Sequence, residues 1–320
     1  MPKSITVAKC EVGFFKPNAT FGYLILRSMV LSWLSAVFRR SNSLSYFLAR
    51  NSERIGSTGG LTLGRSSPQG RVDLVGAGPG DPELLTRRAW NLLHQCDAVV
   101  YDALVSAELM ASLPSRIERH YVGKRCGQHS VTQDEIGKLL CDLAQQGKHV
   151  VRLKGGDPLM FGRLGEELDQ LIEAAIAYSV VPGIGAASGC AASVAMPLTE
   201  RGLAKGLRLI TASLSEAEEQ LNWSDLAQEE ETLVFYMGLS KASTISLKLI
   251  DAGLPANFPV LIVENGTQRQ QRNISTTLQG LPVTVNTFKI QAPALIYVGK
   301  IVGKLSQRQG CLIGPGMAMT

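Results

Sequence analysis

Short apolar runs alternate with amphipathic segments along most of this chain, and this pattern is its clearest structural signal. In residues 71–182 the apolar runs are rich in β-branched residues and lead into glycines or acidic residues. Between the runs lie segments such as Glu83–Gln95, whose apolar side chains recur at helical spacing. Strands that alternate with helices predict a largely parallel sheet. The predicted strands are Val72–Val75, Ala98–Tyr101, a strand ending near Val122, and His149–Leu153, and a helix preceded by hydroxyl caps reaches Gln146.

A second series of apolar runs follows in residues 183–305. It begins with the small residues Gly183–Ala192, which predict a helix whose backbone another helix or a ligand can approach closely. We therefore expect two α/β domains, residues 71–182 and 183–305, followed by a disordered tail at 306–320. The strands predicted in the second domain are Leu207–Thr211, Thr232–Tyr236, Pro259–Val263 and Ala294–Val298, with a helix at Ala242–Ala252.

Residues 1–70 differ from the rest of the chain. Their apolar run Phe21–Phe38 contains Arg27 and is followed by two arginines. The composition fits a membrane segment or signal anchor, an organellar transit peptide, or an upstream segment without a folded role. We expect a poorly ordered or targeting leader without catalytic residues. The expected location is cytoplasmic, or organellar if the leader is a transit peptide.

The leader also explains the net charge of +5. Residues 1–70 hold nine basic and two acidic residues, so the remainder of the chain is slightly acidic. The basic balance therefore gives no reason to expect nucleic acid as a partner. The six cysteines show no paired spacing and none forms a ligand pattern with the four histidines, which indicates a reducing compartment and no metal site.

The segment Val72–Pro82 predicts a strand, a tight loop and a helix start, with Asp81 as the N-cap. A dinucleotide fingerprint would need a third glycine where Asp81 stands. Pro79 also removes an N–H group from a loop that would have to bind phosphate. A small neutral or cationic adenosyl ligand suits this loop better.

Special residues end three of the predicted strands: Gly76–Pro82, Asp102 and Gly155–Pro158. Two of these segments contain Gly-Asp-Pro, which by itself is ordinary turn chemistry. Ligands of open α/β sheets bind beyond the carboxyl ends of the strands. Three such segments on one edge of one sheet therefore predict a binding site.

An ordered series of motifs identifies a family that this sequence closely resembles. The runs are Val75–Thr86, Tyr101–Ser106, Val122–Arg125, Arg152–Pro158, Val181–Ile184, Tyr236–Leu239 and Val263–Thr267. Together, over about residues 72–303, they resemble the tetrapyrrole methylases, and within them the branch that methylates uroporphyrinogen III. The resemblance implies a two-domain class III methyltransferase with a ligand cleft between the domains. It also implies S-adenosylmethionine as methyl donor and a homodimer.

The implied reaction is methylation of uroporphyrinogen III at C2 and C7 to precorrin-2, in sirohaem or cobalamin synthesis. The resemblance marks Asp102 as proton acceptor and Lys124 as proton donor. It marks Arg163, Glu166 and Arg201 as substrate-binding residues, since arginines are suited to the substrate's carboxylates; Arg125 is a further candidate. The implied cofactor-binding residues are Pro79, Gly155, Gly156, Asp157, Met160, Gly185, Ala186, Met237 and Gly266.

The sequence also departs from the family's pattern. Gly185, Glu200 and Ala212-Ser213 stand where relatives commonly have Thr, His and a Gly-His pair. Glu200 places a negative charge beside Arg201, where an acidic substrate would bind. These departures leave open a non-catalytic paralogue that binds cofactor or tetrapyrrole. A methylase of a later corrin precursor is a second alternative, which the runs Val122–Arg125 and Tyr101–Ser106 argue against. Residues 1–70 are too short for a fused dehydrogenase and ferrochelatase module, so we expect neither activity.

Overall fold

The computed structural model describes residues 70–123, 131–212 and 221–305. The expectations for the leader, for Lys124 and Arg125, for Ser213 and for the tail at 306–320 lie outside these residues. Among the described residues, no helix has the length and apolar character that crossing a membrane requires.

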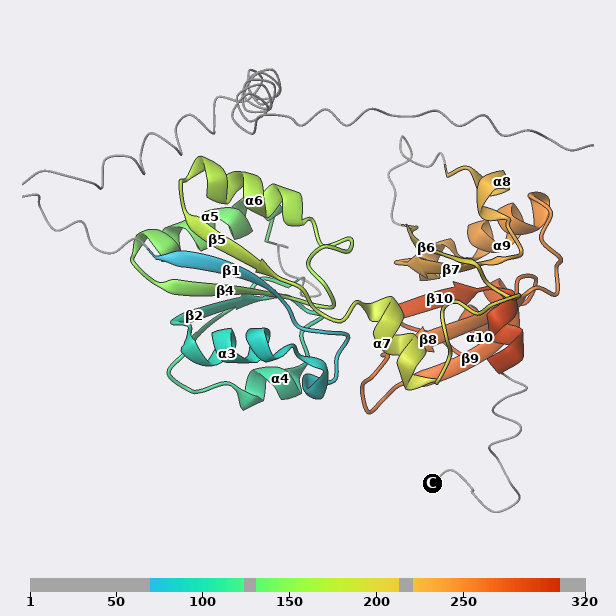
Figure 1. Cartoon of the computed structure of the whole chain (residues 1–320), viewed down its shortest axis with the longest axis horizontal. Helices are drawn as coiled ribbons and strands as arrows, with labels where there is room; N and C mark the ends of the chain where they lie inside the picture. Colours follow the sequence, from blue (N-terminus) through green and yellow to red (C-terminus); the bar gives the residue numbers. More distant parts are fainter. Residues whose placement is uncertain (1–69, 124–130, 213–220, 306–320) are drawn as a thin grey trace, which may run out of the picture. The chain divides into compact units, whose positions relative to one another are not determined.

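The first sheet is entirely parallel, as the alternating pattern predicts, with strand order β3-β2-β4-β1-β5. Its elements are β1 (Arg71–Gly76), η2 (Pro82–Leu84), α3 (Arg87–Gln95), β2 (Ala98–Tyr101), α4 (Ala107–Ser112), β3 (Glu118–Tyr121), α5 (Gln133–Gln145), β4 (His149–Lys154), α6 (Leu164–Glu173) and β5 (Ala177–Val181). Helices α3 and α4 cover one face of this sheet, and α5 and α6 cover the other (Figure 1).

The two faces of the first sheet are buried by alternate residues of the same strands. Val151 and Leu153 of β4 pack with α3 and α4, whereas Val150 packs with α5 and α6. Thr132 caps α5 with its side chain, and Glu135 completes a capping box, so this helix begins where the hydroxyl caps predict. The parallel strands place all their carboxyl ends on one edge of the sheet.

The second sheet is mixed, with strand order β6-β7-β10-β8-β9. Only β6 and β7 are paired in parallel among its strands, and the other pairs are antiparallel. Its elements are α7 (Ala186–Ser193), β6 (Gly206–Thr211), α8 (Trp223–Leu226), β7 (Glu231–Tyr236), η3 (Leu239–Lys241), α9 (Ala242–Asp251), β8 (Pro259–Glu264), β9 (Arg272–Thr277), α10 (Leu281–Thr287) and β10 (Ala294–Val298).

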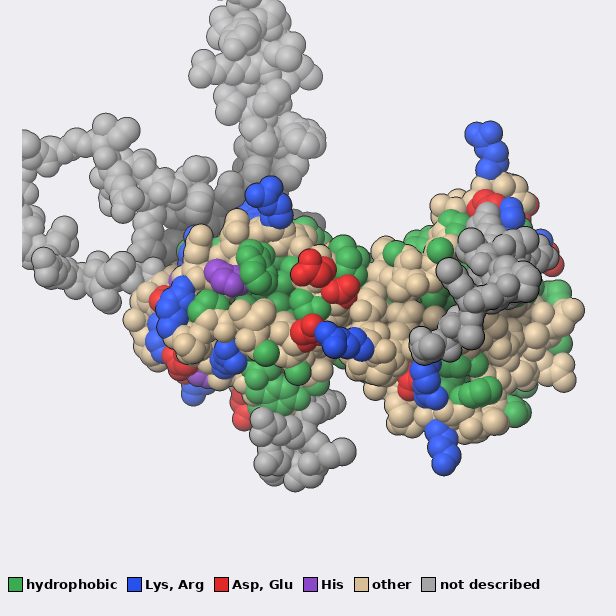
Figure 2. Space-filling model, turned by 90° about the horizontal axis from the view of Figure 1, so that it is seen from below, with side chains coloured by type: hydrophobic (Ala, Val, Ile, Leu, Met, Phe, Trp, Pro, Cys, Tyr) green, Lys and Arg blue, Asp and Glu red, His purple; other side chains and the backbone are tan. Residues whose placement is uncertain are grey.

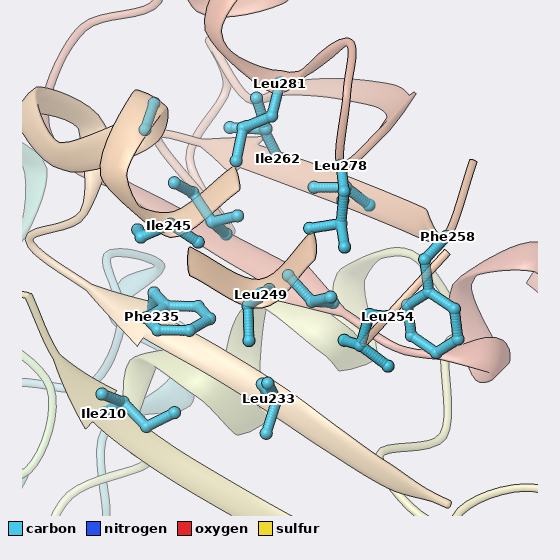
Figure 3. Close-up of a cluster of buried hydrophobic side chains, with 14 of the residues drawn as sticks. Ile210, Leu233, Phe235, Ile245, Leu249, Leu254, Phe258, Ile262, Leu278 and Leu281 are labelled. Atoms are coloured by element: carbon cyan, nitrogen blue, oxygen red, sulfur yellow. The ribbon is translucent and has the colours of Figure 1, made fainter. Parts of the chain in front are cut away.

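One face of the second sheet forms the core drawn in Figure 3. Phe235 of β7 and Ile262 of β8 lie there against Leu249 of α9, and all three are fully buried. Their strand neighbours Val234 and Val263 point to the opposite face, where they pack with α7. This alternation holds α7 against the sheet through small side chains. The run of small residues predicts the helix itself, but not that a sheet packs on it.

The structure corrects one sequence expectation and contains elements that the sequence did not predict. The helix expected over Glu83–Gln95 is divided: Asp81 caps only the short η2, and α3 begins after the new N-cap Thr86. Strand β9 and helix α10 were not predicted, because most of their residues are polar or β-branched and show no clear period. Both are stabilised by tertiary contacts, such as the hydrogen bond between Thr276 and Thr284.

A buried carboxylate lies near the amino ends of the first sheet's strands. Asp73 of β1 is 2% exposed and accepts hydrogen bonds from Arg71 at 2.8 Å and Ser179 at 2.6 Å, while His149 Nε2 lies 2.6 Å away. Burial by itself raises the pKa of Asp73, but the hydrogen bonds from His149, Ser179 and Arg71 outweigh it and lower the pKa to about 2. Asp73 therefore stabilises the fold as an ion.

The pH dependence of stability should show this carboxylate. Because the folded-state pKa lies below the ordinary value of 3.8, its contribution is complete above pH 3.8 and is lost as pH falls toward 2. We expect Asp73→Asn to lower the free energy of unfolding at pH 7 by about 2 kcal/mol and to flatten its acid slope. Urea denaturation between pH 7 and 2 measures both. The exposed Asp251→Asn serves as control, and an unchanged acid slope in Asp73→Asn would contradict the assignment.

Candidate functional site

The loops that follow β1 and β4 are joined through their backbones at the carboxyl edge of the first sheet. The Gly78 N–H donates to the Gly156 carbonyl at 3.1 Å, and the Gly156 N–H donates to the Gly78 carbonyl at 2.7 Å. Their φ angles of 73° and 69° lie in the left-handed region that favours glycine. The two Gly-Asp-Pro loops therefore lie side by side, as their positions at strand ends predict.

The loop after β5 packs directly on these two loops. A Cβ atom on Gly183 would lie 2.2 Å from the carbonyl oxygen of Gly156, and one on Gly76 would lie 2.6 Å from the Cα atom of Gly183. Both contacts are with backbone, which cannot move aside as a flexible side chain can. Glycine is therefore required at these positions for the three loops to meet.

Asp102 follows β2 at the same edge, and its carboxylate is held from two sides. Oδ1 accepts a hydrogen bond from the Leu104 N–H at 3.0 Å, and Oδ2 lies 3.5 Å from Nη2 of Arg152. The Asp102 side chain remains 27% exposed. Leu104 also packs on Gly155. A Cβ atom added to Gly155 would lie 2.4 Å from the Cβ atom of Leu104. The predicted proton acceptor thus lies next to the predicted cofactor loop.

The predicted substrate residues Arg163 and Glu166 form an exposed pair at the start of α6. Nε and Nη2 of Arg163 donate to the two carboxylate oxygens of Glu166 at 2.7 and 2.6 Å. This pairing leaves further N–H donors of the guanidinium for a ligand. Arg201, by contrast, is an exposed residue of the turn between Glu200 and Ala204, and the contacts described here do not join it to the other predicted residues. Glu200 is paired with Lys304.

Helix α7 connects several of the predicted cofactor residues. An added Cβ on Gly189 would lie 2.4 Å from Pro79, and one on Gly266 would lie 2.1 Å from Sγ of Cys190. The loop after β1 and the loop after β8 therefore both approach this helix closely. Asp81 N–H also donates to Oγ1 of Thr267 at 3.1 Å. The small side chains of α7 make these approaches possible.

An aromatic contact joins the loop after β4 to β7. The rings of Phe161 and Tyr236 lie 4.9 Å apart, and the Tyr236 hydroxyl accepts from the Ala187 N–H at 3.0 Å. Met237, the next residue, is 50% exposed and has a φ of 54°; Phe161 has the same φ. Such angles are strained for residues with side chains and are concentrated at functional sites. The predicted apolar lip of the pocket, Met237, is therefore held in an unusual conformation.

The residues around α7 suit an adenosyl sulfonium ligand. A Cβ added to Gly185 would meet no atom within 4 Å, and one on Gly156 would meet only the Ala186 nitrogen at 3.7 Å. Open space therefore lies beside a backbone of small residues. Asp157 stands in the adjoining loop, where its Oδ1 accepts from the Leu159 N–H at 2.9 Å and its carbonyl accepts from the Met160 N–H at 3.0 Å. Met160 has a thioether, Asp157 has a carboxylate, and the backbone at Gly185 is accessible. Such a ligand can contact groups of all three kinds.

Sequence reasoning did not find three buried charged residues beside the site. Arg152 and Lys154 of β4 are each 4% exposed, and Glu167 of α6 is fully buried. The signal was present, because two basic residues alternate with apolar ones inside an otherwise buried strand. A central strand carries such residues only where a partner compensates their charge.

Two further observations concern the surface. A hollow of about 530 Å³ lies over η2, α3 and α4, and it is lined by none of the predicted site residues. Figure 2 shows acidic and basic side chains interspersed over the visible face of the described residues.

Within the described ranges, no group of three or more His, Cys, Asp and Glu side chains is arranged to hold a metal ion.

Comparisons with known proteins place this geometry in context. Residues 71–282 match the family model of the tetrapyrrole (corrin/porphyrin) methylases. The siroheme synthase of Escherichia coli O1:K1 is 52% identical over 235 residues, which are 73% of this chain and 51% of that protein. The chain therefore spans about half the length of the curated relatives it matches.

Solved structures show the same likeness. The uroporphyrin-III C-methyltransferase of Thermus thermophilus complexed with S-adenyl homocysteine is 36% identical, with a TM-score of 0.63 over 73% of this chain and all of that one. A cobalt precorrin-4 methyltransferase of cobalamin biosynthesis is 28% identical, with a TM-score of 0.66 over 75% of this chain and 99% of that chain.

Proposed function

Because this chain belongs to the tetrapyrrole (corrin/porphyrin) methylase family, we propose that it methylates uroporphyrinogen III at C2 and C7 to precorrin-2. The identity with a siroheme synthase and with a uroporphyrin-III C-methyltransferase supports this substrate. The observation that carries the proposal is the position of Asp102. Its partly exposed carboxylate stands at the same sheet edge as the two glycine loops, beside Gly155.

S-adenosylmethionine supplies an electrophilic methyl group in this reaction. Gly156, Gly185 and Ala186 would bind it along their open backbone, with Asp157 in the adjoining loop and Met237 at the lip. An electron-rich pyrrole carbon needs no further activation to accept the methyl group, so the protein has to orient the two substrates. The macrocycle then carries a positive charge and must lose a proton, which Asp102 accepts.

Binding of the substrate combines charge with apolar surface. Arg163 would bind carboxylates of the macrocycle with the donors that Glu166 leaves unused. Leu104, Leu159 and Phe161, in the loops after β2 and β4, are 54%, 60% and 39% exposed. Exposed apolar residues grouped in neighbouring loops are typical of a ligand-binding surface. They would contact the pyrrole rings of the macrocycle.

An anaerobic assay of the full chain with uroporphyrinogen III and S-adenosylmethionine tests the proposal. We expect a dimethylated product, detected by mass spectrometry and by the absorbance of its oxidised form, together with S-adenosylhomocysteine. Cofactor binding in calorimetry without methyl transfer would favour a non-catalytic paralogue. Methyl transfer to a later corrin precursor but not to uroporphyrinogen III would favour the second alternative, which the structural likeness to a cobalt precorrin-4 methyltransferase keeps relevant.

A further inference from the structure

A buried ionic network lies under the proposed site. Arg152 and Lys154 occupy alternate positions of β4, so both side chains lie on the face of the sheet that α5 and α6 cover. Glu167 of α6 accepts from Nε of Arg152 at 3.0 Å and from Nζ of Lys154 at 2.6 Å. Burying charges is costly even when they are paired, and apolar side chains of similar size would often stabilise the fold equally well. The network therefore suggests a role beyond stability.

Arg152 is fixed by buried partners on almost every side. Besides Glu167, its Nη1 donates to the carbonyl oxygens of Leu153 at 3.1 Å and Val100 at 3.4 Å. The remaining Nη2 faces Oδ2 of Asp102 at 3.5 Å, and Asp102 is the most exposed of these partners. A guanidinium is planar, and its donors cannot rotate independently. The buried bonds therefore determine where the group that faces Asp102 lies.

The same network reaches the turn that carries the proposed substrate residues. Glu166 and Glu167 are adjacent in the first turn of α6, yet they point in different directions: Glu166 is 49% exposed and pairs with Arg163, whereas Glu167 is buried. Glu167 thus links this turn to Arg152, and Arg152 links it to Asp102. No single helix or strand contains all of these residues.

We propose that Arg152 is a positioning residue that, held by Glu167, fixes the Asp102 carboxylate relative to the substrate-binding turn of α6. The inference rests on the proposed function, in which Asp102 accepts the proton. The Leu104 N–H donates to Oδ1 of Asp102, and the Arg152 guanidinium lies opposite Oδ2. Without Arg152 the carboxylate keeps one of its two constraints and loses its orientation.

Arg152→Lys tests this with the charge retained, because an ammonium group cannot reproduce the planar fork. We expect kcat to fall by about 10- to 100-fold, as misplacement of a catalytic group by an ångström does. The KM for uroporphyrinogen III and the affinity for S-adenosylmethionine should stay within about threefold, since neither depends on the orientation of Asp102. Equal losses in binding and in kcat would contradict a positioning role.

Lys154→Met is the matched control. Lys154 has the same strand, face, burial and partner as Arg152. Its ammonium group feels the charge of Asp102, but no hydrogen bond or ion pair among the described residues joins the two, so it cannot orient that carboxylate. If the network served stability alone, both variants would lose stability and activity alike. We expect Lys154→Met to retain kcat within about threefold at a temperature where circular dichroism shows both variants folded.

A double-mutant cycle separates the inference from the proposed function. In an Asp102→Asn background, Arg152→Lys should have little further effect on kcat, because it acts through Asp102. If the effects of the two substitutions on kcat multiply in the double variant, the inference is overturned and the proposed function still stands. If the wild-type chain methylates nothing, the proposed function fails. Crystal structures of the two variants then decide the inference, which requires Asp102 to leave its position in Arg152→Lys but not in Lys154→Met.

Discussion

Replacing Asp102 by asparagine is expected to lower kcat for methyl transfer by about 10²- to 10⁴-fold, the range for loss of a general base. Asparagine has the same shape and keeps an oxygen that can accept from the Leu104 N–H. It cannot accept a proton at neutral pH. Binding of S-adenosylmethionine, measured by calorimetry, should be unchanged, since the proposed contacts to it come from the loop after β4 and from α7.

Asp81→Asn provides the control for the local turn. Asp81 accepts a hydrogen bond from the N–H group two residues ahead, that of Glu83 at 2.9 Å, in the same way as Asp102 accepts from Leu104. It also follows a strand of the same sheet. We expect Asp81→Asn to keep wild-type turnover, and equal losses in both variants would show that the Asp-to-Asn change acts by disturbing the turns. Wild-type turnover by Asp102→Asn would exclude this residue as the proton acceptor.

Gly183→Ala is expected to lower the free energy of unfolding by about 3 kcal/mol, the upper part of the range for overpacking. The added methyl carbon would lie 2.2 Å from the Gly156 carbonyl oxygen and 3.0 Å from the Gly76 Cα atom. Neither atom can move without displacing its loop. We therefore also expect weaker binding of S-adenosylmethionine, because Gly156 belongs to the proposed binding loop. Urea denaturation gives the stability, and calorimetry gives the affinity.

Gly165→Ala makes the same chemical change where space is available. Gly165 lies in α6, and a Cβ there would meet no atom within 4 Å. Alanine should stabilise this helix by about 0.5–1 kcal/mol, since glycine loses more conformational entropy on folding. Equal midpoints of unfolding for Gly183→Ala and the wild type would show that the three loops are not packed as described.

The sequence by itself predicted four of the five strands of the first sheet and the edge on which a site is expected. Apolar runs separated by amphipathic helices favour a parallel sheet, and parallel strands bring their carboxyl ends together. The Gly-Asp-Pro loops and Asp102 could therefore be placed on one edge before any coordinates were known. The ordered motifs gave the family, which the comparison over residues 71–282 confirms. The roles of individual residues stay predictions.

Only the tertiary structure decided which distant residues meet. Arg152 and Glu167 are 15 positions apart, and neither carries a local signal that names its partner. Strand β9 pairs with β8, the strand just before it, and α10 contacts α9, so both elements depend on packing that their local sequences do not show. The physical reason is the same in each case. Local sequence patterns indicate which side chains are buried. The free energy of a buried charge or a strained loop depends instead on the partner that folding brings to it.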